Sequence, residues 1–533
     1  MSASDLIKRR DTMLQARLPH ESVTRECFDY TLPERGDGFN GQQLDAQQIQ
    51  NKRAKILDST GTDAVRILAS AIQAGLTPSN SRWFGMDVSH ASHEEKTWLD
   101  GAAETLWENI HNANFDAAGF EGCLDLVCAG WFALYVDEDK ERGGFAFELW
   151  PLSSLALGST RTDGKIDIVH RTYYLTAEQA VKEFGDTNLS ESTRKKALDA
   201  PETKVEFIHA IYPRTPHVVG AVRAKNLPIA SSHVEVSARR MVKESGYHEM
   251  PVIVPRWCRL PNSVYATGPV KDALPDIKML NELKRMEFAS LDLAIAGMWI
   301  AEDDGVLNPR TVKVGPRKII VANSVDSMKP LVSGASFNIA FSSEERLQAS
   351  IRKLLMADQL QPQSGPQMTA TEVHVRVDLI RQQLGPMYGR LQAEYLKPLV
   401  ERCFGLAFRA GVFSDPPPSL AGREFSVTYV SPMARAQKLE DVSAMDRYEL
   451  SLAAELQINP QSETADNYDR DKATRRRAQL LGVPTDLIRD EKGRDRIRAQ
   501  RADEQQQAAQ RQVAMGAMQT AANQTAKQAV VNR

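Results

Sequence analysis

The spacing of apolar residues predicts helices in the first quarter of the chain. Residues 1–57 have helical character that is broken near 32–41, where LPERGDGFNG supplies turn-forming Pro, Gly and Asn. Apolar residues three and four positions apart then predict a helix that Ser59 or Thr62 caps and that stops at Gly75. A further helical stretch covers about 93–130.

From Trp131 to about Val254 the pattern changes to short runs in which every second residue is apolar. β-Branched and aromatic residues in such runs, bounded by Gly, Asp and Pro, are typical of strands. One short helix, 176–185, interrupts them, so we predict an α+β body. The predicted strands are FALYVDED (132–139), FAFELWPL (145–152), IDIVHRTYYL (166–175), VEFIHAIYP (205–213) and MPVIVPRW (250–257).

Helical spacing returns in 268–296, and a second helix is predicted for 342–358. Between them lies a β-rich insert, 298–334, whose best strand is VKVGPRKIIV. The pattern places six apolar residues on one side of the first helix: Leu274, Ile277, Leu280, Leu283, Met286 and Leu291.

A polar stretch, QLQPQSGPQMTATE (359–372), separates this second helix from the longest periodic segment of the chain. Thr369 and Glu372 form a capping box that starts the long helix. Prolines after Gly385 and Lys397 are expected to kink or break it. FSVTYVS (425–431) is one further strand, and the chain beyond about Met433 is helical and increasingly polar. Its last part, 503–533, is dominated by Gln and Ala, which indicates a frayed helix or a disordered end.

Composition and charge narrow the class of protein. The 533 residues are 42% hydrophobic and 25% charged, with a net charge of −3, which disfavours a protein that simply coats nucleic acid. No apolar run is long enough for a membrane span, and the N-terminus has no secretory signal. The five scattered cysteines predict reduced thiols that mostly pack in the core.

The chain carries few of the sequence motifs that mark catalytic, nucleotide-binding or metal-binding sites. It has no phosphate-binding GxxxxGK[ST] loop, no GxSxG elbow and no HExxH, so we predict no catalytic residues and no cofactor. SHASHEE (89–95) resembles a metal cluster but lacks a third and fourth ligand, so no metal site is predicted. The basic run RDKATRRRAQ (470–479) is either a solvated helix face or a phosphate contact.

The order of these parts resembles that of the portal, or head-to-tail connector, proteins of short-tailed bacteriophages, over about residues 5–500. The segments that carry the resemblance are AIQAGLTPSNSRWFGMDV (71–88), FEGCLDLVCAGWFALYVDED (120–139), VYATGPVKDALPDIKMLNEL (264–283), MTATEV (368–373) and LGPMYGRLQAEYLKPLVER (384–402). The resemblance implies a predominantly helical α+β chain with wing, stem, clip and crown, assembled as a ring of twelve subunits around a central channel.

On this resemblance the chain divides into nine parts. They are an N-terminal arm and α+β wing (1–265), a first stem helix (266–297), a clip (298–336), a second stem helix (337–358), a channel loop (359–370), a long kinked wing helix (371–412), a wing return strand (413–435), a helical crown (436–502) and a Gln/Ala-rich tail (503–533).

The resemblance also implies partners. Family members stand at one vertex of the capsid, assemble in the host cytoplasm with major capsid and scaffolding proteins, and meet a terminase large subunit and a tail adaptor protein. Double-stranded DNA passes through the channel. The side chains expected to contact it are those of the uncharged loop residues Gln361, Gln363, Ser364 and Gln367. Because affinity for DNA comes mainly from Lys and Arg, such contacts would barely retard the duplex. The clip side chains Arg310, Lys313, Arg317 and Lys318 are expected to contact the motor or the adaptor.

Two other classes of function remain open from the residues alone. The first is a DNA-binding or scaffolding protein without a channel that uses the helices of 470–501, which predicts a monomer or dimer with strongly salt-dependent affinity for DNA. The second is an enzyme of unrecognised type built on the 131–254 body, which predicts a pocket with convergent polar groups. A plain connector is the alternative role for the loop 359–370.

Overall fold

The chain forms two compact units, which are described separately. The first comprises Met1–Arg82 and Leu106–Val412, and the second comprises Trp83–Thr105 and Phe413–Arg533. The computed structural model describes residues 1–36, 45–88, 92–215, 223–296, 298–301, 324, 328–331, 337–360, 385, 387–420, 426–429, 432–458, 467–481, 483, 487–489, 491, 493–508, 510–511 and 515.

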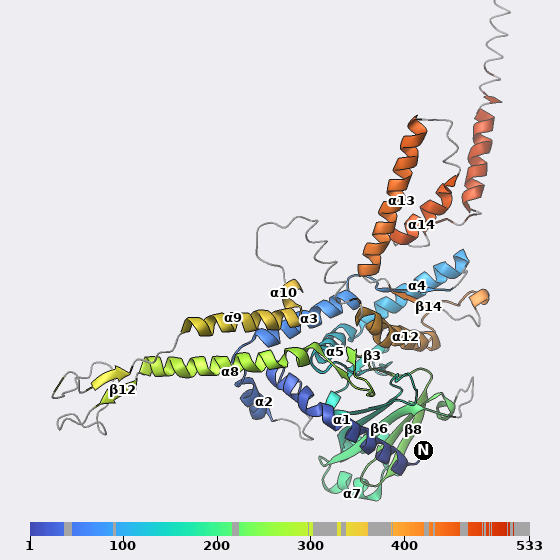
Figure 1. Ribbon diagram of the computed structural model, residues 1–533. Coiled ribbons are helices and arrows are strands. Elements are labelled where there is room, and N and C mark those ends of the chain that lie inside the picture. The colour runs from blue at the N-terminus through green and yellow to red at the C-terminus, as the bar shows by residue number, and fades with distance from the viewer. Residues whose placement is uncertain are drawn as a thin grey trace, which may run out of the picture. The chain divides into compact units, whose positions relative to one another are not determined.

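A five-stranded antiparallel sheet is the largest β-structure of the first unit (Figure 1). Every neighbouring pair is also adjacent in sequence, so the sheet is a meander with two helices inserted between its second and third strands. In order its strands are β4 (Leu155–Gly158), β5 (Ile168–Thr176), β6 (Lys204–Pro213), β7 (Ile229–Glu235) and β8 (Arg240–Tyr247), and the inserted helices are α6 (Ala177–Phe184) and α7 (Glu191–Asp199).

The two faces of this sheet bury different partners, because successive side chains of a strand point to opposite sides. Ile208 and Ala210 of β6 pack with Leu6 and Met13 of the long helix α1 (Ala3–Thr31). Phe207 packs on the opposite face, in a cluster that includes residues of α6. The N-terminal helix is therefore part of the core built on this five-stranded sheet.

A smaller sheet of β3 (Phe145–Leu149), β2 (Leu134–Glu138) and β9 (Val252–Ile253) adjoins the helix α5 (Phe115–Ala129), which packs in turn against α3 (Thr60–Leu76). Helix α5 ends at Gly130, whose φ of +85° is left-handed and favours glycine. A Cβ on Gly130 would lie 2.2 Å from the carbonyl carbon of Thr267, and one on Gly268 would lie 2.4 Å from the carbonyl oxygen of Val127. These two glycines let the end of α5 touch the backbone just before α8.

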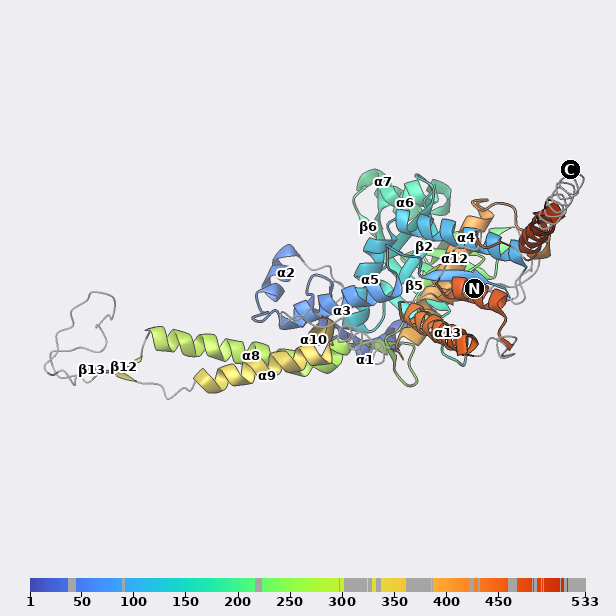
Figure 2. The same cartoon turned by 90° about the horizontal axis from the view of Figure 1, so that it is seen from above.

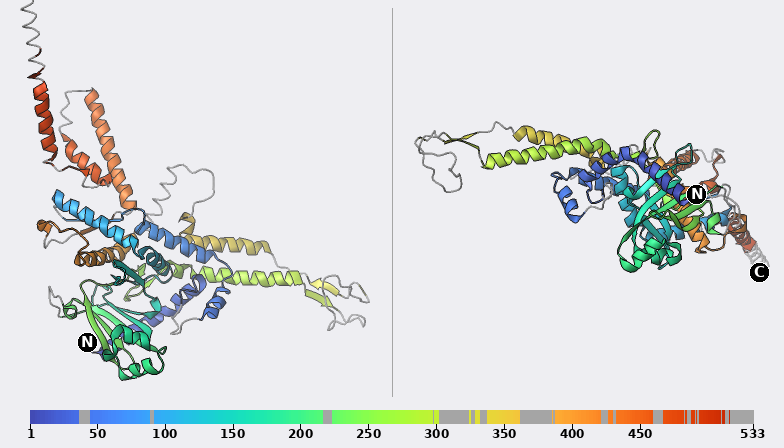
Figure 3. Two further views of the ribbon diagram at one scale, coloured as in Figure 1. Left: turned by 180° about the vertical axis from the view of Figure 1, so that it is seen from behind. Right: turned by 90° about the horizontal axis from the view of Figure 1, so that it is seen from below.

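Helices α8 (Pro269–Ala296) and α9 (Phe337–Leu354) lie side by side as an antiparallel hairpin (Figures 2 and 3). The short helix α10 (Ala357–Leu360) follows α9, and the hairpin β12 (Met298–Ala301) with β13 (Met328–Leu331) lies beyond its far end. The small hairpin of β10 (Cys258–Arg259) and β11 (Ala266–Thr267) precedes α8.

The long helix predicted after the polar loop is described only in its second half. It contains a π-helical turn, Gln392–Leu396, immediately before α12 (Lys397–Arg409). The sequence predicted that the helix kinks or breaks at Lys397–Pro398. In the structure the irregularity is the π-helical turn just before these residues, which accommodates the proline without a sharp kink. The predicted capping box at Thr369 and Glu372 and the kink after Gly385 lie outside the described residues.

The second unit pairs β1 (Phe84–Asp87) with β14 (Ser426–Tyr429), which confirms the strand predicted at 425–431. Helix α4 (His93–Asn112) begins in this unit. Helices α13 (Pro432–Ile458) and α14 (Arg470–Leu481) pack together, and a further helical stretch includes residues 493–508.

Most predicted helices and strands are confirmed, with corrections at particular residues. The predicted helix 93–130 is two helices, α4 and α5, and the strand predicted at 250–257 shrinks to β9. Strands β4, β7 and β8 and helix α7 were not predicted. The side chain of Asp58, rather than that of Ser59 or Thr62, accepts a hydrogen bond from the first amide of α3, that of Thr60 (2.8 Å).

Candidate functional surface on the α8–α9 hairpin

Helix α8 is anchored at its N-terminal half by apolar burial. Val270, Ala273, Ile277 and Leu280 are buried, and the helix packs against α1 and α5 there. A Cβ on Gly61 of α3 would lie 3.2 Å from Ile277, so that helix also approaches closely. Burial of Val, Ile and Leu side chains contributes about 1.5–3 kcal/mol each, enough to fix the root of the hairpin.

Polar contacts along the hairpin set the register of α8 against α9. The Lys284 ammonium lies 2.7 Å from a carboxylate oxygen of Glu344 and 3.3 Å from one of Glu287, and the hydrogen bond to Glu344 raises the pKa of Lys284. The Ser350 hydroxyl donates to Asp276 at 2.6 Å. Because these contacts recur at intervals along both helices, the hairpin is held as one element.

Beyond its root, α8 leaves large apolar side chains in solvent. Met279 and Met286 are 64% and 54% exposed, and at 100° per residue they share one face. Phe288 and Leu291 are 55% and 45% exposed and lie roughly on the opposite face. Exposed apolar residues that cluster on an element mark contacts with a partner.

The sequence placed six apolar residues on one side of α8, and the structure divides them by burial. Leu274, Ile277 and Leu280 are buried, whereas Met286 and Leu291 are exposed. The reason is that α8 extends beyond α1 and α5, so that its far half packs mainly against α9. Met279 was missed altogether, although its spacing of seven from Met286 was a signal in the sequence.

The solvent-facing side of α9 has a different character. Its exposed residues include Glu345, Arg346, Arg352 and Lys353, which give this face an excess of positive charge. The exposed face of α9 is therefore mostly charged, whereas α8 exposes large apolar side chains on two faces.

None of the residues that the sequence predicted to contact DNA or other proteins falls within the described part of the chain. The loop residues Gln361, Gln363, Ser364 and Gln367 and the clip residues Arg310, Lys313, Arg317 and Lys318 all lie outside it. Those assignments stay predictions. Of the neighbouring segments, the structure describes α9 and α10 before the loop and β12 and β13 at the two ends of the clip.

The basic run 470–479 is largely neutralised within the second unit. Arg477 of α14 lies 2.9 Å from Asp446 and 2.8 Å from Glu449, both on α13. Asp471 accepts two hydrogen bonds from Arg498, each of 2.7 Å. These arginines hold three helical segments together, so a large part of their charge is already matched by carboxylates.

The perturbed acids of the first unit are likewise in structural contacts. Glu235 accepts hydrogen bonds from the hydroxyls of Ser190 (2.5 Å) and Thr193 (2.6 Å), which keep its pKa low against the effect of burial. Burial raises the pKa of Asp125, and Arg35 binds its two oxygens at 2.7 and 3.1 Å. Each carboxylate ties together segments far apart in sequence.

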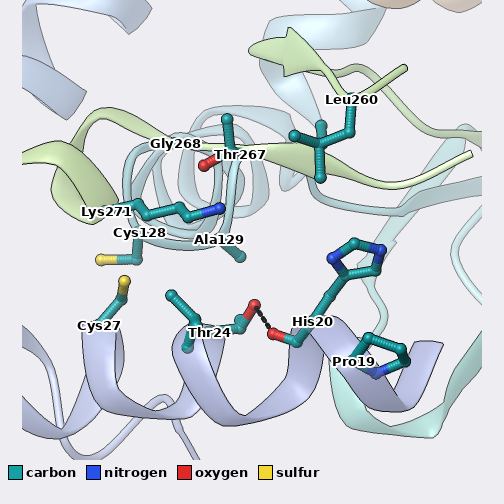
Figure 4. A pocket seen from close by; sticks show the side chains of 12 residues that line it. Pro19, His20, Thr24, Cys27, Cys128, Ala129, Leu260, Thr267, Gly268 and Lys271 are labelled. Atoms are coloured by element: carbon teal, nitrogen blue, oxygen red, sulfur yellow. Dashed lines mark hydrogen bonds between the residues drawn. The ribbon is translucent and has the colours of Figure 1, made fainter. Parts of the chain in front are cut away.

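One small cavity, of about 40 Å³, lies between α1, the end of α5 and the start of α8 (Figure 4). This volume holds about one or two waters, well below the several hundred Å³ of a typical substrate pocket. Among the described residues, no three His, Cys, Asp or Glu side chains come together as metal ligands. No helix in the described ranges is both long and apolar enough to cross a membrane.

Comparison with known proteins places these features in one family. The family described as bacteriophage head to tail connecting protein matches residues 3–488. A probable portal protein of Bordetella phage BPP-1 is 27% identical over 535 residues, covering 95% of this chain and 92% of that protein. The portal protein of Salmonella phage epsilon15 is also 27% identical, over 529 residues that cover 96% of this chain and 93% of that protein.

A chain in the solved structure of the virion of a native gene transfer agent particle aligns with 80% of this chain and 90% of its own length, at 12% identity and a TM-score of 0.36. The family match spans most of the sequence, including the α8–α9 hairpin and both units. The chain therefore belongs to the bacteriophage head-to-tail connecting protein family.

Proposed function

We propose that this chain is the subunit of a portal ring at one vertex of a phage capsid, in which twelve copies surround a channel for double-stranded DNA. Family membership over residues 3–488 supports the portal role. The observation that carries the ring is the α8–α9 hairpin, which presents exposed apolar residues on two faces of α8. A head-to-tail ring uses two different surfaces of each subunit, one toward each neighbour.

In this proposal α8 and α9 are the two stem helices, and the insert 298–336 is the clip. The sheet β4–β8 with α1, α6 and α7 belongs to the wing, and α13 and α14 belong to the crown. The contacts between Lys284 and Glu344 and between Ser350 and Asp276 keep the stem rigid. A rigid stem lets each subunit present its two faces at a constant angle, which closure of a ring requires.

The segment 359–370, directly after α10, is proposed to be the channel loop. Gln361, Gln363, Ser364 and Gln367 offer hydrogen-bonding groups without charge. Because Lys and Arg contacts with phosphates supply most non-specific affinity, such a loop touches the duplex and barely retards it. The net charge of −3 per subunit also disfavours trapping of a polyanion.

The clip residues Arg310, Lys313, Arg317 and Lys318 are proposed to contact a terminase large subunit during packaging and a tail adaptor protein afterwards. Major capsid and scaffolding proteins are the proposed partners at the wing. Assembly is proposed to take place in the host cytoplasm, and the mature protein stands in the virion. Charge reversal at the four clip residues that left both ring formation and DNA packaging intact would exclude their role as contacts.

The affinity of the purified protein for duplex DNA tests the proposal against a DNA-binding protein without a channel. We expect weak binding at physiological salt, measured by fluorescence anisotropy of a labelled duplex, in a preparation whose mass is determined in parallel. Tight binding by a monomer or dimer, with an affinity that falls steeply with salt, would instead support the alternative.

A further inference from the structure

Two buried thiols line the same cavity where α1 meets α5. Cys27 of α1 and Cys128 of α5 are each 1% exposed, and both line the cavity described above. Figure 4 shows the Cys27 sulfur directed toward the Cys128 side chain, whose own sulfur points sideways along the same edge of the cavity. Both cysteines are free thiols in this structure.

A single hydroxyl contacts both cysteines. The Thr31 hydroxyl donates to the carbonyl oxygen of Cys27 at 2.6 Å, and the same oxygen lies 3.5 Å from Sγ of Cys128. Because the hydroxyl proton is used on Cys27, the Cys128 thiol is the donor in the second contact. Because Thr31 lies one helical turn after Cys27, this contact places Sγ of Cys128 against the last turn of α1.

The cavity offers access to a small reagent only. Its volume of about 40 Å³ admits a molecule of one or two oxygen atoms and excludes a peptide-sized disulfide such as oxidised glutathione. Lys271 of α8 also lines it (Figure 4), and its charge acts to lower the pKa of the Cys27 thiol. A positive charge there favours the thiolate form, which is the nucleophile.

We propose that Cys27 and Cys128 are a modification site for hydrogen peroxide, which converts them to an intramolecular disulfide. The Cys27 thiolate attacks one peroxide oxygen, the O–O bond breaks, and Cys27 becomes a sulfenic acid while hydroxide takes up a proton and leaves as water. The Cys128 sulfur then displaces the sulfenic hydroxyl, which leaves as a second water with the thiol proton. In sum, two thiols and one peroxide give one disulfide and two waters.

Burial makes this reaction slow. It raises the pKa of the Cys27 thiol to about 12, partly offset by Lys271, and it raises the pKa of Cys128 as well. The thiolate is therefore scarce near neutral pH, and the rate is expected to rise about tenfold per pH unit while the pH stays below the thiol pKa. A slow reaction is compatible with a disulfide that forms gradually during the lifetime of a virion.

The disulfide would tie α1 to α5 close to the root of α8. If the proposed function holds, the protein is made in a reducing cytoplasm and later stands in a virion outside the cell, where oxidants persist. The disulfide would then form after assembly of the virion. The chemistry itself depends only on the two thiols and the cavity, so its test is independent of ring formation.

The experiment uses the full chain with Cys258→Ser, which removes the exposed thiol. The folded protein is treated with hydrogen peroxide, its remaining thiols are alkylated under denaturing conditions, and peptides are mapped by mass spectrometry. Cys123 is the matched control, because it lies on the same helix, is 2% exposed and has a pKa raised by burial to about 12, yet does not line the cavity.

We expect a Cys27–Cys128 crosslink that is lighter by two hydrogens, an unmodified Cys123, and no crosslink with oxidised glutathione over the same time. The oxidised protein should melt several degrees higher, since the bond closes a loop of about 100 residues, and Cys27→Ser should abolish the shift. Equal retention of Cys27, Cys128 and Cys123 as free thiols would overturn the proposal. So would oxidation of Cys27 or Cys128 to sulfinic acid without a crosslink.

Discussion

Arg256 and Glu394 form a paired ion bridge across 138 residues of sequence, with Nε to Oε2 at 3.0 Å and Nη2 to Oε1 at 2.7 Å. The Arg256 side chain is only 4% exposed and also donates to the carbonyl oxygens of Gly164 and Val264. Glu394 lies within the π-helical turn Gln392–Leu396. The pair therefore fastens an irregular helical turn to the loop that precedes β10.

Replacement of this glutamate should be costly. Glu394→Gln is expected to lower the free energy of unfolding by about 2–3 kcal/mol, because it leaves a buried guanidinium without its countercharge. Urea unfolding followed by circular dichroism measures the change. Glu401→Gln on α12 is the matched control, since its contact with Lys397 is exposed and 3.8 Å long, and it should change the free energy by less than about 0.5 kcal/mol.

Gly268 is a second sensitive position, at the start of α8. Gly268→Ala is expected to cost about 2–3 kcal/mol of unfolding free energy, because its Cβ would meet the backbone of α5 and its C-cap within 3.0 Å. Gly101→Ala on α4 is the control, since nothing lies within 4 Å of its Cβ. That change should be neutral or should stabilise by up to about 1 kcal/mol, and no difference between the two variants would exclude the close approach of α5 and α8.

Three histidines in the five-stranded sheet predict sensitivity to acid. The rings of His209 and His233 stack at 4.0 Å, and His170 is fully buried with both ring nitrogens unpartnered. Burial lowers the pKa of His170 to about 3 and that of His233 to about 4, and it lowers the pKa of His209 well below its usual value. The positive charges of Arg171 and Lys243 also lower the pKa of His209 and His233, whereas the negative charge of Glu183 raises that of His233.

The sign of the effect follows from these shifts. The unfolded chain binds protons at these histidines near pH 6.5 and the folded chain does not, so stability is complete above pH 6.5 and falls as the pH drops toward 4. We expect a loss on the order of 1 kcal/mol per histidine per pH unit. His170→Leu should leave stability at pH 7 nearly unchanged and reduce the loss between pH 6 and 4. An unchanged acid profile in that variant would show that His170 does not contribute.

The exposed methionines of α8 predict where a ring is vulnerable. Met279→Glu combined with Met286→Glu is expected to reduce the fraction of protein in rings at least about tenfold, because association would bury two carboxylates. The melting temperature of the single chain should change little. Leu198→Glu on α7, which replaces a residue that is 86% exposed, is the control and should leave assembly intact. Light scattering measures the mass of each variant, and rings at wild-type yield in the double variant would exclude this face of α8.

The internal ion pairs of the second unit predict how DNA affinity can be increased. Asp471→Asn removes the partner of Arg498 and weakens the contact with Arg494. The non-specific affinity for duplex DNA should therefore rise, and the slope of the logarithm of the binding constant against the logarithm of salt concentration should steepen by about one. Asp503→Asn, which removes the same charge from an exposed site nearby, is the control. If both variants bind DNA alike, the arginines of this unit are not restrained by Asp471.

The outcome of sequence-based prediction differs along the chain for physical reasons. Leu274, Ile277 and Leu280 were predicted to share one side of a helix and they are buried there, because local helical spacing determines that face. Strand β7 escaped prediction because Ser231, Ser232 and His233 are polar, although Ser231 and Ser232 are buried in the sheet between β6 and β8. The contact between Glu394 and Arg256 depends on a register that residues far apart in sequence create together, so no local pattern reveals it.

The proposed portal ring is tested most directly by the mass and the end-on image of particles formed by the purified 59.3 kDa chain. We expect a ring of about twelve subunits with an axial hole, in which the two faces of the α8–α9 hairpin meet different neighbours. A chain that remains a monomer at every concentration, with or without scaffolding protein, and binds duplex DNA tightly at physiological salt would contradict it.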